Sequence, residues 1–142
     1  MQKVLWVILL AAFTMLIFLS SSLPMSESGR LSSMAAAFLG QLLDIAGISV
    51  DGNLEHLIRK LAHFTAFAVQ GGLLCRTFSE FRIANRLANG YVLFFGLLTA
   101  VADEYIQSFS AGRTSAVNDV LLDFSGTLSM WLAYRIWQWS RH

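Results

Sequence analysis

The sequence predicts an all-α membrane protein, a four-transmembrane-helix bundle with an amphipathic helix between the first and second spans. Hydrophobic residues make up 56% of the 142 residues and charged residues 13%. A soluble globular chain has about 25% charged residues, so this chain lacks the side chains for a polar exterior. Four apolar segments near bilayer length also follow one another along the chain. With one proline and no repeat, residues 1–142 are expected to form a single membrane domain.

The charge balance and the cysteine content exclude several classes of protein. Ten basic residues against nine acidic residues give no electrostatic footprint for nucleic acid, so no nucleic-acid partner is expected. The single cysteine, Cys75, excludes an internal disulfide and a cysteine-rich metal site. No motif has a diagnostic metal or cofactor spacing, so neither is expected, and a carboxylate-rich metal site with His63 stays open as an alternative. The expected partners are membrane lipids. The sequence leaves open whether the chain forms a homo-oligomer.

The first span is expected over residues 4–23, which begin with the uncharged run VLWVILLAAFTMLIFL. A signal peptide is the competing interpretation, because Lys3 precedes the run and three serines follow it. The run is longer than a signal core of about 7–15 residues and no clean A-x-A cleavage site follows. We therefore expect a retained span.

An amphipathic helix is expected over residues 31–48, where apolar residues recur at positions 31, 34, 35, 38, 42 and 45. Ser32 and Ser33 are available as N-terminal caps. The helix would lie on the membrane surface or pack against the bundle, and the pattern does not separate these two placements.

Three further spans are expected over residues 59–78, 87–109 and 116–139. Each one is interrupted by polar groups, and the tryptophans of the last suit a headgroup belt. Short apolar runs also occur as core helices of soluble proteins, but the composition argues against that class.

The basic residues predict how the spans are oriented. Four spans place both termini on one side, together with Lys3, Arg76, Arg82, Arg86, Arg135 and Arg141. The other side has Arg30, Arg59, Lys60 and Arg113. The positive-inside rule then predicts a multi-pass protein of the inner (cytoplasmic) membrane with both termini in the cytoplasm.

This topology gathers the unusual polar residues at the outer ends of three spans. They are Arg59, Lys60, His63, Asp103, Glu104, Gln107, Arg113, Asp119 and Asp123. Residues three or four apart share a helix face, as Lys60 and His63 do, whereas Glu104 points about 100° away from its neighbour. An isolated charge at mid-bilayer costs about 2.5–3.5 kcal/mol, so such groups are retained where they are paired, hydrated or functional. The sequence therefore predicts an outward-facing polar pocket.

Several of these residues also have purely structural interpretations. Asp119 would complement the dipole of the last helix behind a Thr114 or Ser115 cap. Arg113 would neutralise Asp103 or Glu104, and His63 and Gln70 would form hydrogen bonds between helices. Glycines such as Gly126 are most simply positions of close helix packing.

The polar motifs resemble those of the VanZ-like family of small integral membrane proteins. The resemblance rests on RKLAHFTAF at 59–67, on ADEYIQSFSAGRTSAVNDVLLDFSG at 102–126 and on the Ser-rich FLSSSLPMSESGRLS at 18–32. It covers most of the chain. It supports as site residues Arg59, Lys60, His63, Asp103, Glu104, Gln107, Arg113 and Asp119. Two departures are Asp123, where the family usually has asparagine, and Ala111, where it usually has proline.

The resemblance does not define a general biochemical activity. The family is named for a protein that confers low-level resistance to the glycopeptide teicoplanin, and function belongs to sites rather than folds. We expect a protein that binds, or protects against, an envelope amphiphile such as a lipid-linked or glycopeptide-type ligand. The ligand-binding residues would be Arg59, Lys60, Gln107, Arg113, Asp119 and Asp123.

Two other functions stay open on the sequence. In a membrane-embedded hydrolase or transferase, His63 would be the general base, and Asp103 or Glu104 would orient it or act as an acid. No G-x-S-x-G nucleophile motif is present. A proton-coupled transporter would need polar groups through the bilayer, and only Gln70 and Thr99 continue inward from the pocket.

Overall fold

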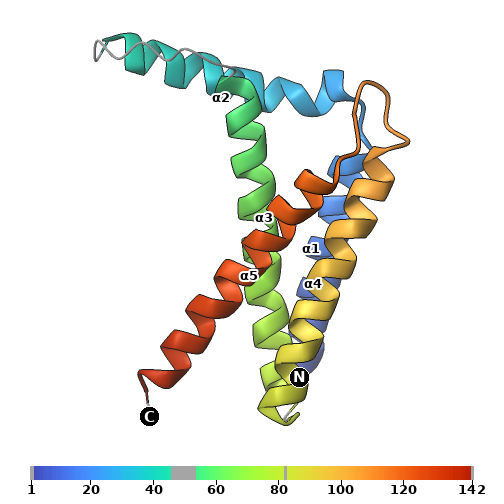
Figure 1. Cartoon of the computed structure of the whole chain (residues 1–142), viewed down its shortest axis with the longest axis vertical. Coiled ribbons are helices and arrows are strands. Elements are labelled where there is room, and N and C mark those ends of the chain that lie inside the picture. The colour runs from blue at the N-terminus through green and yellow to red at the C-terminus, as the bar shows by residue number, and fades with distance from the viewer. Residues whose placement is uncertain (1, 46–53, 82, 142) are drawn as a thin grey trace.

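The computed structural model describes residues 2–45, 54–81 and 83–141. The described residues form five α-helices and no strands (Figure 1), which confirms the all-α class. The helices are α1 (Gln2–Ser22), α2 (Met25–Ile45), α3 (Leu54–Glu80), α4 (Asn85–Gln107) and α5 (Val117–Trp139).

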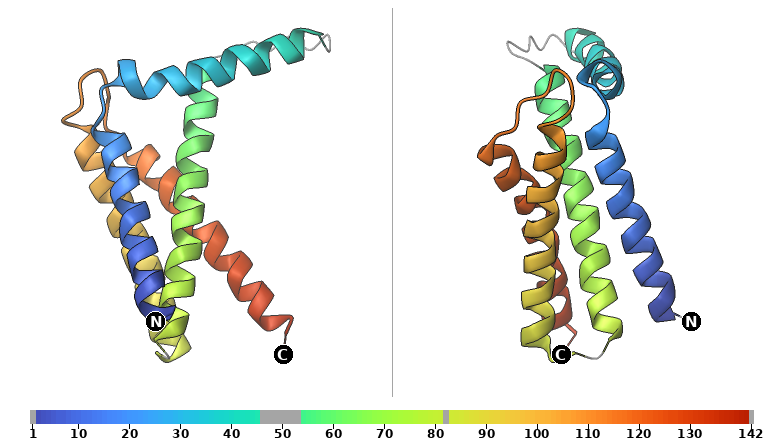
Figure 2. Two further views of the ribbon diagram at one scale, coloured as in Figure 1. Left: turned by 180° about the vertical axis from the view of Figure 1, so that it is seen from behind. Right: turned by 90° about the vertical axis from the view of Figure 1, so that its right-hand side faces the viewer.

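The four long helices that correspond to the predicted spans alternate in direction. α1, α3 and α4 run side by side, α5 crosses α3, and α2 lies across one end of the group (Figures 1 and 2). The described ends of the chain both lie at the opposite end, apart from each other (Figure 2). By length and composition, α1 is the one helix in the described part of the chain that could cross a membrane. The other three contain more charged or polar residues.

Helix α2 begins earlier than the apolar pattern predicts. The predicted start was residue 31 with Ser32 or Ser33 as a cap, whereas the helix begins at Met25, directly after Pro24. Proline disfavours helical geometry at the residue before it and is well tolerated at a helix start, so it separates α2 from α1. Ser33 Oγ donates to the Arg30 carbonyl inside the helix (2.9 Å), so the predicted cap at Ser33 is wrong. Residues 46–48 of the predicted helix lie outside the described residues.

Several large apolar side chains of α2 are exposed, although the helix itself contacts α3. Met34 is 68% exposed, Phe38 65% and Ile45 84%. An amphipathic helix that packed against the bundle would bury this face. The exposure therefore favours the surface placement, with these side chains available to a membrane interface.

Polar residues outnumber apolar residues in the interior of the described structure. Ten buried residues are polar or charged and six are apolar among the residues described. Long apolar side chains are exposed instead, as shown by Val4 (62%), Ile8 (58%) and Leu16 (60%) on α1. Soluble proteins show the reverse pattern, with charged residues almost never fully buried. The exterior is therefore suited to apolar surroundings.

Glycines allow α3, α4 and α5 to approach one another closely around Thr127. A Cβ atom at Gly126 would collide with the Phe64 carbonyl oxygen and lie 3.0 Å from the Ala68 nitrogen. A Cβ atom at Gly71 would lie 2.9 Å from Thr127 Cα, and one at Gly96 would collide with the Thr127 methyl group. Thr127 Oγ1 also donates to a backbone carbonyl of α3 (3.2 Å). These small residues allow α5 to cross α3 closely, which is the most extensive contact between helices.

We predict that Gly126→Ala destabilises the protein by about 1–3 kcal/mol, because the new methyl group meets backbone atoms that cannot rotate away. The measurement is the thermal unfolding midpoint of purified protein in detergent. Gly90→Ala is the matched control, since this α4 glycine has nothing within 4 Å of the added Cβ atom. The control should leave the midpoint unchanged or raise it, because alanine is the better helix former. Equal midpoints for both variants would contradict the close crossing of α3 and α5.

Candidate functional site

A polar cavity of about 180 Å³ lies at the end of the structure where α2 is found. Eight of the nine predicted site residues line it, namely Arg59, Lys60, His63, Glu104, Gln107, Arg113, Asp119 and Asp123. They come from α3, α4, α5 and the connection between α4 and α5. The ninth, Asp103, is fully buried directly behind His63.

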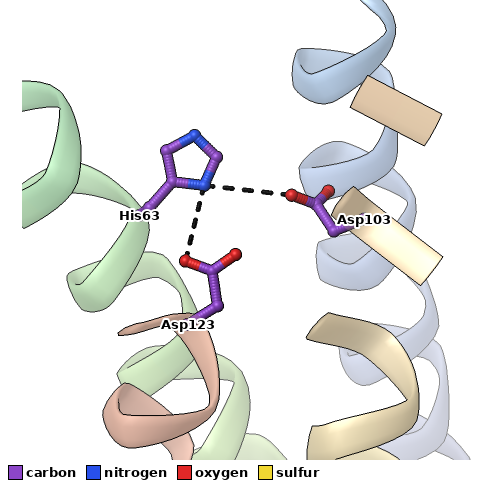
Figure 3. Close-up of side chains that lie close together, drawn as sticks. All are labelled: His63, Asp103 and Asp123. Atoms are coloured by element: carbon purple, nitrogen blue, oxygen red, sulfur yellow. Dashed lines mark ion pairs between the residues drawn. The ribbon is translucent and has the colours of Figure 1, made fainter. Parts of the chain in front are cut away.

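Three helices meet at His63. The imidazole of His63 on α3 lies between Asp103 of α4 and Asp123 of α5 (Figure 3). His63 Nδ1 is 3.8 Å from Asp103 Oδ2 and 3.6 Å from Asp123 Oδ1. Both distances exceed those of a hydrogen bond, so the three groups face one another without a direct bond.

The two carboxylates beside His63 are incompletely paired. Gln107 Nε2 donates to Asp103 Oδ2 (2.7 Å), one turn along α4. Asp103 Oδ1 and both oxygens of Asp123 are buried and have no hydrogen-bond partner among the described residues. A buried polar atom without a partner costs about 1–3 kcal/mol, and more when it is charged. These oxygens therefore indicate a ligand, an ion or a proton at this position.

Glu104 has a different neighbour from Asp103, in keeping with their angular separation on α4. Glu104 Oε1 accepts a hydrogen bond from the Ala116 nitrogen (2.7 Å), at the residue that precedes α5. Ala116 is the N-terminal cap of α5 and no side-chain cap bond is formed there. The predicted cap by Thr114 or Ser115 is therefore wrong, because the N-terminal cap position is held by Ala116, whose side chain cannot accept a hydrogen bond.

Asp119 is paired with a cation from α3. Lys60 Nζ lies 3.2 Å from Asp119 Oδ1, and the two side chains are 38% and 35% exposed. An ion pair this exposed stabilises a protein by about 1 kcal/mol or less. Its more important effect is to connect the first turn of α5 to α3 at the rim of the cavity.

The two arginines of the cavity are not neutralised by carboxylates. Arg113 donates to the Ser20 carbonyl (3.3 Å) and Arg59 approaches the Met25 sulfur (3.5 Å). Neither forms an ion pair among the described residues, so the predicted neutralisation of Asp103 or Glu104 by Arg113 is not found.

Burial affects the protonation equilibrium of Arg113 without removing its charge. Burial lowers the pKa of Arg113 from its ordinary value, and the nearby carboxylates act in the opposite direction. Arginine remains protonated in proteins, so this residue supplies a positive charge at the cavity. Gly112 precedes it with φ of +78°, a left-handed conformation that glycine adopts without strain and that lets the loop turn toward α2.

Two polar side chains at the site, Ser21 and His56, were not singled out on the sequence. Ser21 is fully buried, lies 3.4 Å from Gln107 Nε2 through its Oγ, and accepts a hydrogen bond from Ser110 Oγ (2.9 Å) at its carbonyl. Its place in the Ser-rich stretch was the only signal. His56 lines the cavity from α3, and its helical spacing with Lys60 and His63 would have placed it there.

An apolar groove of about 420 Å³ adjoins the polar cavity. Its walls include Ile17 of α1 and Ala66 of α3. Arg59, His63 and Arg113 line both spaces. The site therefore combines a polar compartment and an apolar one that share three side chains with positive or titratable nitrogen groups.

A family model described as VanZ/LLP1 matches residues 5–138, nearly the whole chain. The chain belongs to the VanZ/LLP1 family. The resemblance expected from the polar motifs is confirmed. No curated protein and no solved structure matches the chain. Membership in the VanZ/LLP1 family together with the apolar helix α1 supports a membrane protein.

We predict that Glu104→Ala destabilises this VanZ/LLP1 protein by about 1–3 kcal/mol, because it leaves the Ala116 nitrogen without its acceptor. Glu104→Gln should lose less than half as much, since its amide oxygen can still accept. Asp119→Ala serves as the control, because its exposed ion pair contributes about 1 kcal/mol or less. Unfolding midpoints in detergent measure the three effects, and an Asp119→Ala loss larger than that of Glu104→Ala would contradict this assignment.

Proposed function

We propose that this VanZ/LLP1 protein is a four-span membrane protein that binds the anionic headgroup of an envelope amphiphile in its polar cavity. The main support for the proposal is that the polar cavity adjoins the apolar groove and that Arg59, His63 and Arg113 line both. An amphiphile has the same two parts. Its charged group occupies the cavity and its hydrocarbon chain occupies the groove.

The charges of the cavity favour a phosphate or a similar anion. Arg59 and Arg113 form no ion pair among the described residues and both line the cavity. The guanidinium group has donors in a fixed fork that matches phosphate and carboxylate oxygens. Two such groups at the boundary with the groove hold a headgroup at the depth where its chain enters the apolar space.

The surroundings of the site suit a ligand that arrives from a lipid layer. The groove is bounded by α1, α2 and α3, and α2 lies across the end of the bundle with exposed apolar side chains. An amphipathic helix in this arrangement lies in the plane of a membrane interface. The polar cavity then sits at headgroup level, where basic residues attract anionic lipids.

The distribution of basic residues supports an outward-facing cavity. In the topology predicted from the sequence, six basic residues fall on the side of the two termini and four on the side of the cavity. The positive-inside rule assigns the termini to the cytoplasm and the cavity to the envelope side. On that side the ligand classes are a lipid-linked phosphate and a lipoglycopeptide of the teicoplanin type.

A membrane-embedded hydrolase or transferase is the second candidate, favoured by the position of His63. Its imidazole lines the cavity and faces two buried carboxylates. A histidine oriented by a carboxylate is a common general base, and the arginines would stabilise charge on a phosphoryl group. Turnover of a lipid-linked phosphate that is abolished by His63→Ala, with binding retained, would establish this candidate over binding alone.

We predict that Arg113→Ala weakens binding of a prenyl phosphate about 10- to 100-fold, because a hydrogen bond to a charged group contributes about 1.5–3 kcal/mol. Binding is measured by microscale thermophoresis on protein in nanodiscs. The prenyl alcohol and inorganic phosphate are compared as ligands that lack one of the two parts, and both should bind more weakly than the prenyl phosphate. Teicoplanin is measured in parallel to distinguish the two ligand classes.

Arg86→Ala is the matched control for this prediction. Arg86 is exposed in the first turn of α4, at the end of the bundle away from the cavity. Its removal changes the net charge equally and should leave the dissociation constant unchanged. Equal weakening by both variants would show a general charge effect, and undiminished binding by Arg113→Ala would contradict the proposed site.

Cysteine labelling tests the proposed orientation. In a Cys75→Ser background, a cysteine replacing Ser115 should react with a membrane-impermeant thiol reagent in intact cells, and a cysteine replacing Ala84 should be protected. Both positions are exposed, and they lie in the connections at opposite ends of the bundle. Ala84 should become reactive once the membrane is permeabilised. Labelling of the Ala84 position and protection of the Ser115 position in intact cells would place the cavity on the cytoplasmic side.

A further inference from the structure

We propose that His63, Asp103 and Asp123 bind a divalent transition-metal ion, with Zn²⁺ as the best match to this set of donors. The sequence alone predicts no metal, because the three residues lie on three separate helices and have no diagnostic spacing. The fold brings them together (Figure 3). The site is formed by protein side chains alone and does not depend on the proposed amphiphile.

The geometry of the three groups is close to that of a metal site. One nitrogen or oxygen atom from each residue lies within 4.8 Å of the others, in the described part of the chain. The two distances from His63 Nδ1 are 3.6 and 3.8 Å. Ligands about 2.1 Å from a tetrahedral zinc ion lie about 3.4 Å apart. The two distances from His63 would shorten by a few tenths of an ångström, and the two carboxylates would approach each other by at most about 1.4 Å, to complete the coordination.

The unpaired oxygens provide a second and independent observation. Asp123 is 1% exposed, and neither of its oxygens has a hydrogen-bond partner among the described residues. Figure 3 shows its carboxylate directed at the imidazole of His63. Two buried carboxylates side by side repel each other unless a positive charge lies between them. A divalent cation at this position supplies that charge and gives each carboxylate a partner.

A neighbouring side chain already supports one of the ligands. Gln107 Nε2 donates to Asp103 Oδ2 (2.7 Å) and also lies 3.4 Å from Ser21 Oγ. Hydrogen bonds of this kind orient the ligands of metal sites and commonly affect metal affinity 10–100-fold. Gln107 is therefore a positioning residue for the proposed ion.

The donor set and the cavity indicate which ion is held and how. Imidazole suits zinc and other transition ions, whereas magnesium and calcium prefer oxygen ligands alone. Three protein ligands leave the fourth position of a tetrahedral zinc ion open. His63 and Asp123 also line the polar cavity, so the open position faces the space where a ligand enters.

The ion would also contribute to the proposed function. A phosphate oxygen of the headgroup would occupy the open position, while Arg59 and Arg113 contact the remaining oxygens. This second statement rests on the proposed function. The metal site itself is tested with Zn²⁺ alone, so the two can fail separately.

The experiment measures zinc bound to the full chain in detergent micelles. Protein stripped with a chelator is incubated with ZnCl₂, desalted and analysed by inductively coupled plasma mass spectrometry, and the affinity is obtained by competition with a chromophoric chelator. We expect one zinc per chain. Asp123→Asn, which keeps the size of the side chain and removes its charge, should weaken zinc binding more than tenfold. Gln107→Ala should weaken it about 10–100-fold.

Glu80→Gln is the matched control. Glu80 is the last residue of α3 and is paired with Arg76, at the end of the helix away from the cluster. The loss of its charge should leave zinc affinity unchanged. Zinc should raise the unfolding midpoint of the wild type and of Glu80→Gln but not of Asp123→Asn, because an ion that binds only the folded state stabilises it. This readout also shows whether each variant is folded.

Two results would overturn the metal site. One is a zinc content below about 0.1 zinc per chain in wild-type protein after incubation with micromolar zinc. The other is equal zinc affinity in wild type and Asp123→Asn. MnCl₂ and MgCl₂ are measured in the same way, and tighter binding of magnesium than of zinc would overturn the assignment of the ion. If the wild type binds prenyl phosphate in the absence of zinc and Arg113→Ala does not, the proposed function holds even though the metal site is refuted.

Discussion

The close crossing of α3 and α5 at Gly126 is the constraint on which the site depends. Any side chain at position 126 would meet the backbone of α3 at Phe64 and Ala68. His63 directly precedes Phe64, and Asp123 lies one turn before Gly126. The distance between the two helix backbones therefore sets the distance between the imidazole and the carboxylate. Thr127 extends the same contact to α4, which carries Asp103.

The buried polar groups and the apolar exterior are both explained by lipid surroundings. In lipid, apolar side chains are stable on the outside, and helix association relies on close packing and hydrogen bonds between helices. Gln70 donates to Thr14 across α1 and α3 (2.9 Å), and Thr127 donates to an α3 carbonyl. Near the cavity, Ser21 is hydrogen bonded to Ser110 from the α4–α5 connection. The bonds that hold the helices together thus also enclose the site.

Much of the architecture is readable from the sequence because composition and periodicity are local properties. The apolar runs predict four long helices, and α1, α3, α4 and α5 correspond to them. The observed helix ends differ from the predicted ends by a few residues, and the largest difference is the earlier start of α3 at Leu54. The polar motifs predict which residues gather, and eight of the nine line one cavity. The start of α2 was missed because the apolar pattern begins at residue 31, whereas Pro24 sets the helix boundary.

The sequence by itself determined the helical class, the family and the set of polar residues that share one end of the bundle. Only the tertiary structure decided which of them are partners. Asp103 and Glu104 are neighbours in the chain, yet one faces His63 and the other accepts from the nitrogen of Ala116. Asp119 and Asp123 share a helix face, yet one is paired with Lys60 and the other faces His63 with two buried oxygens that form no hydrogen bond. Helical spacing fixes direction around one helix, whereas pairing depends on how closely separate helices cross.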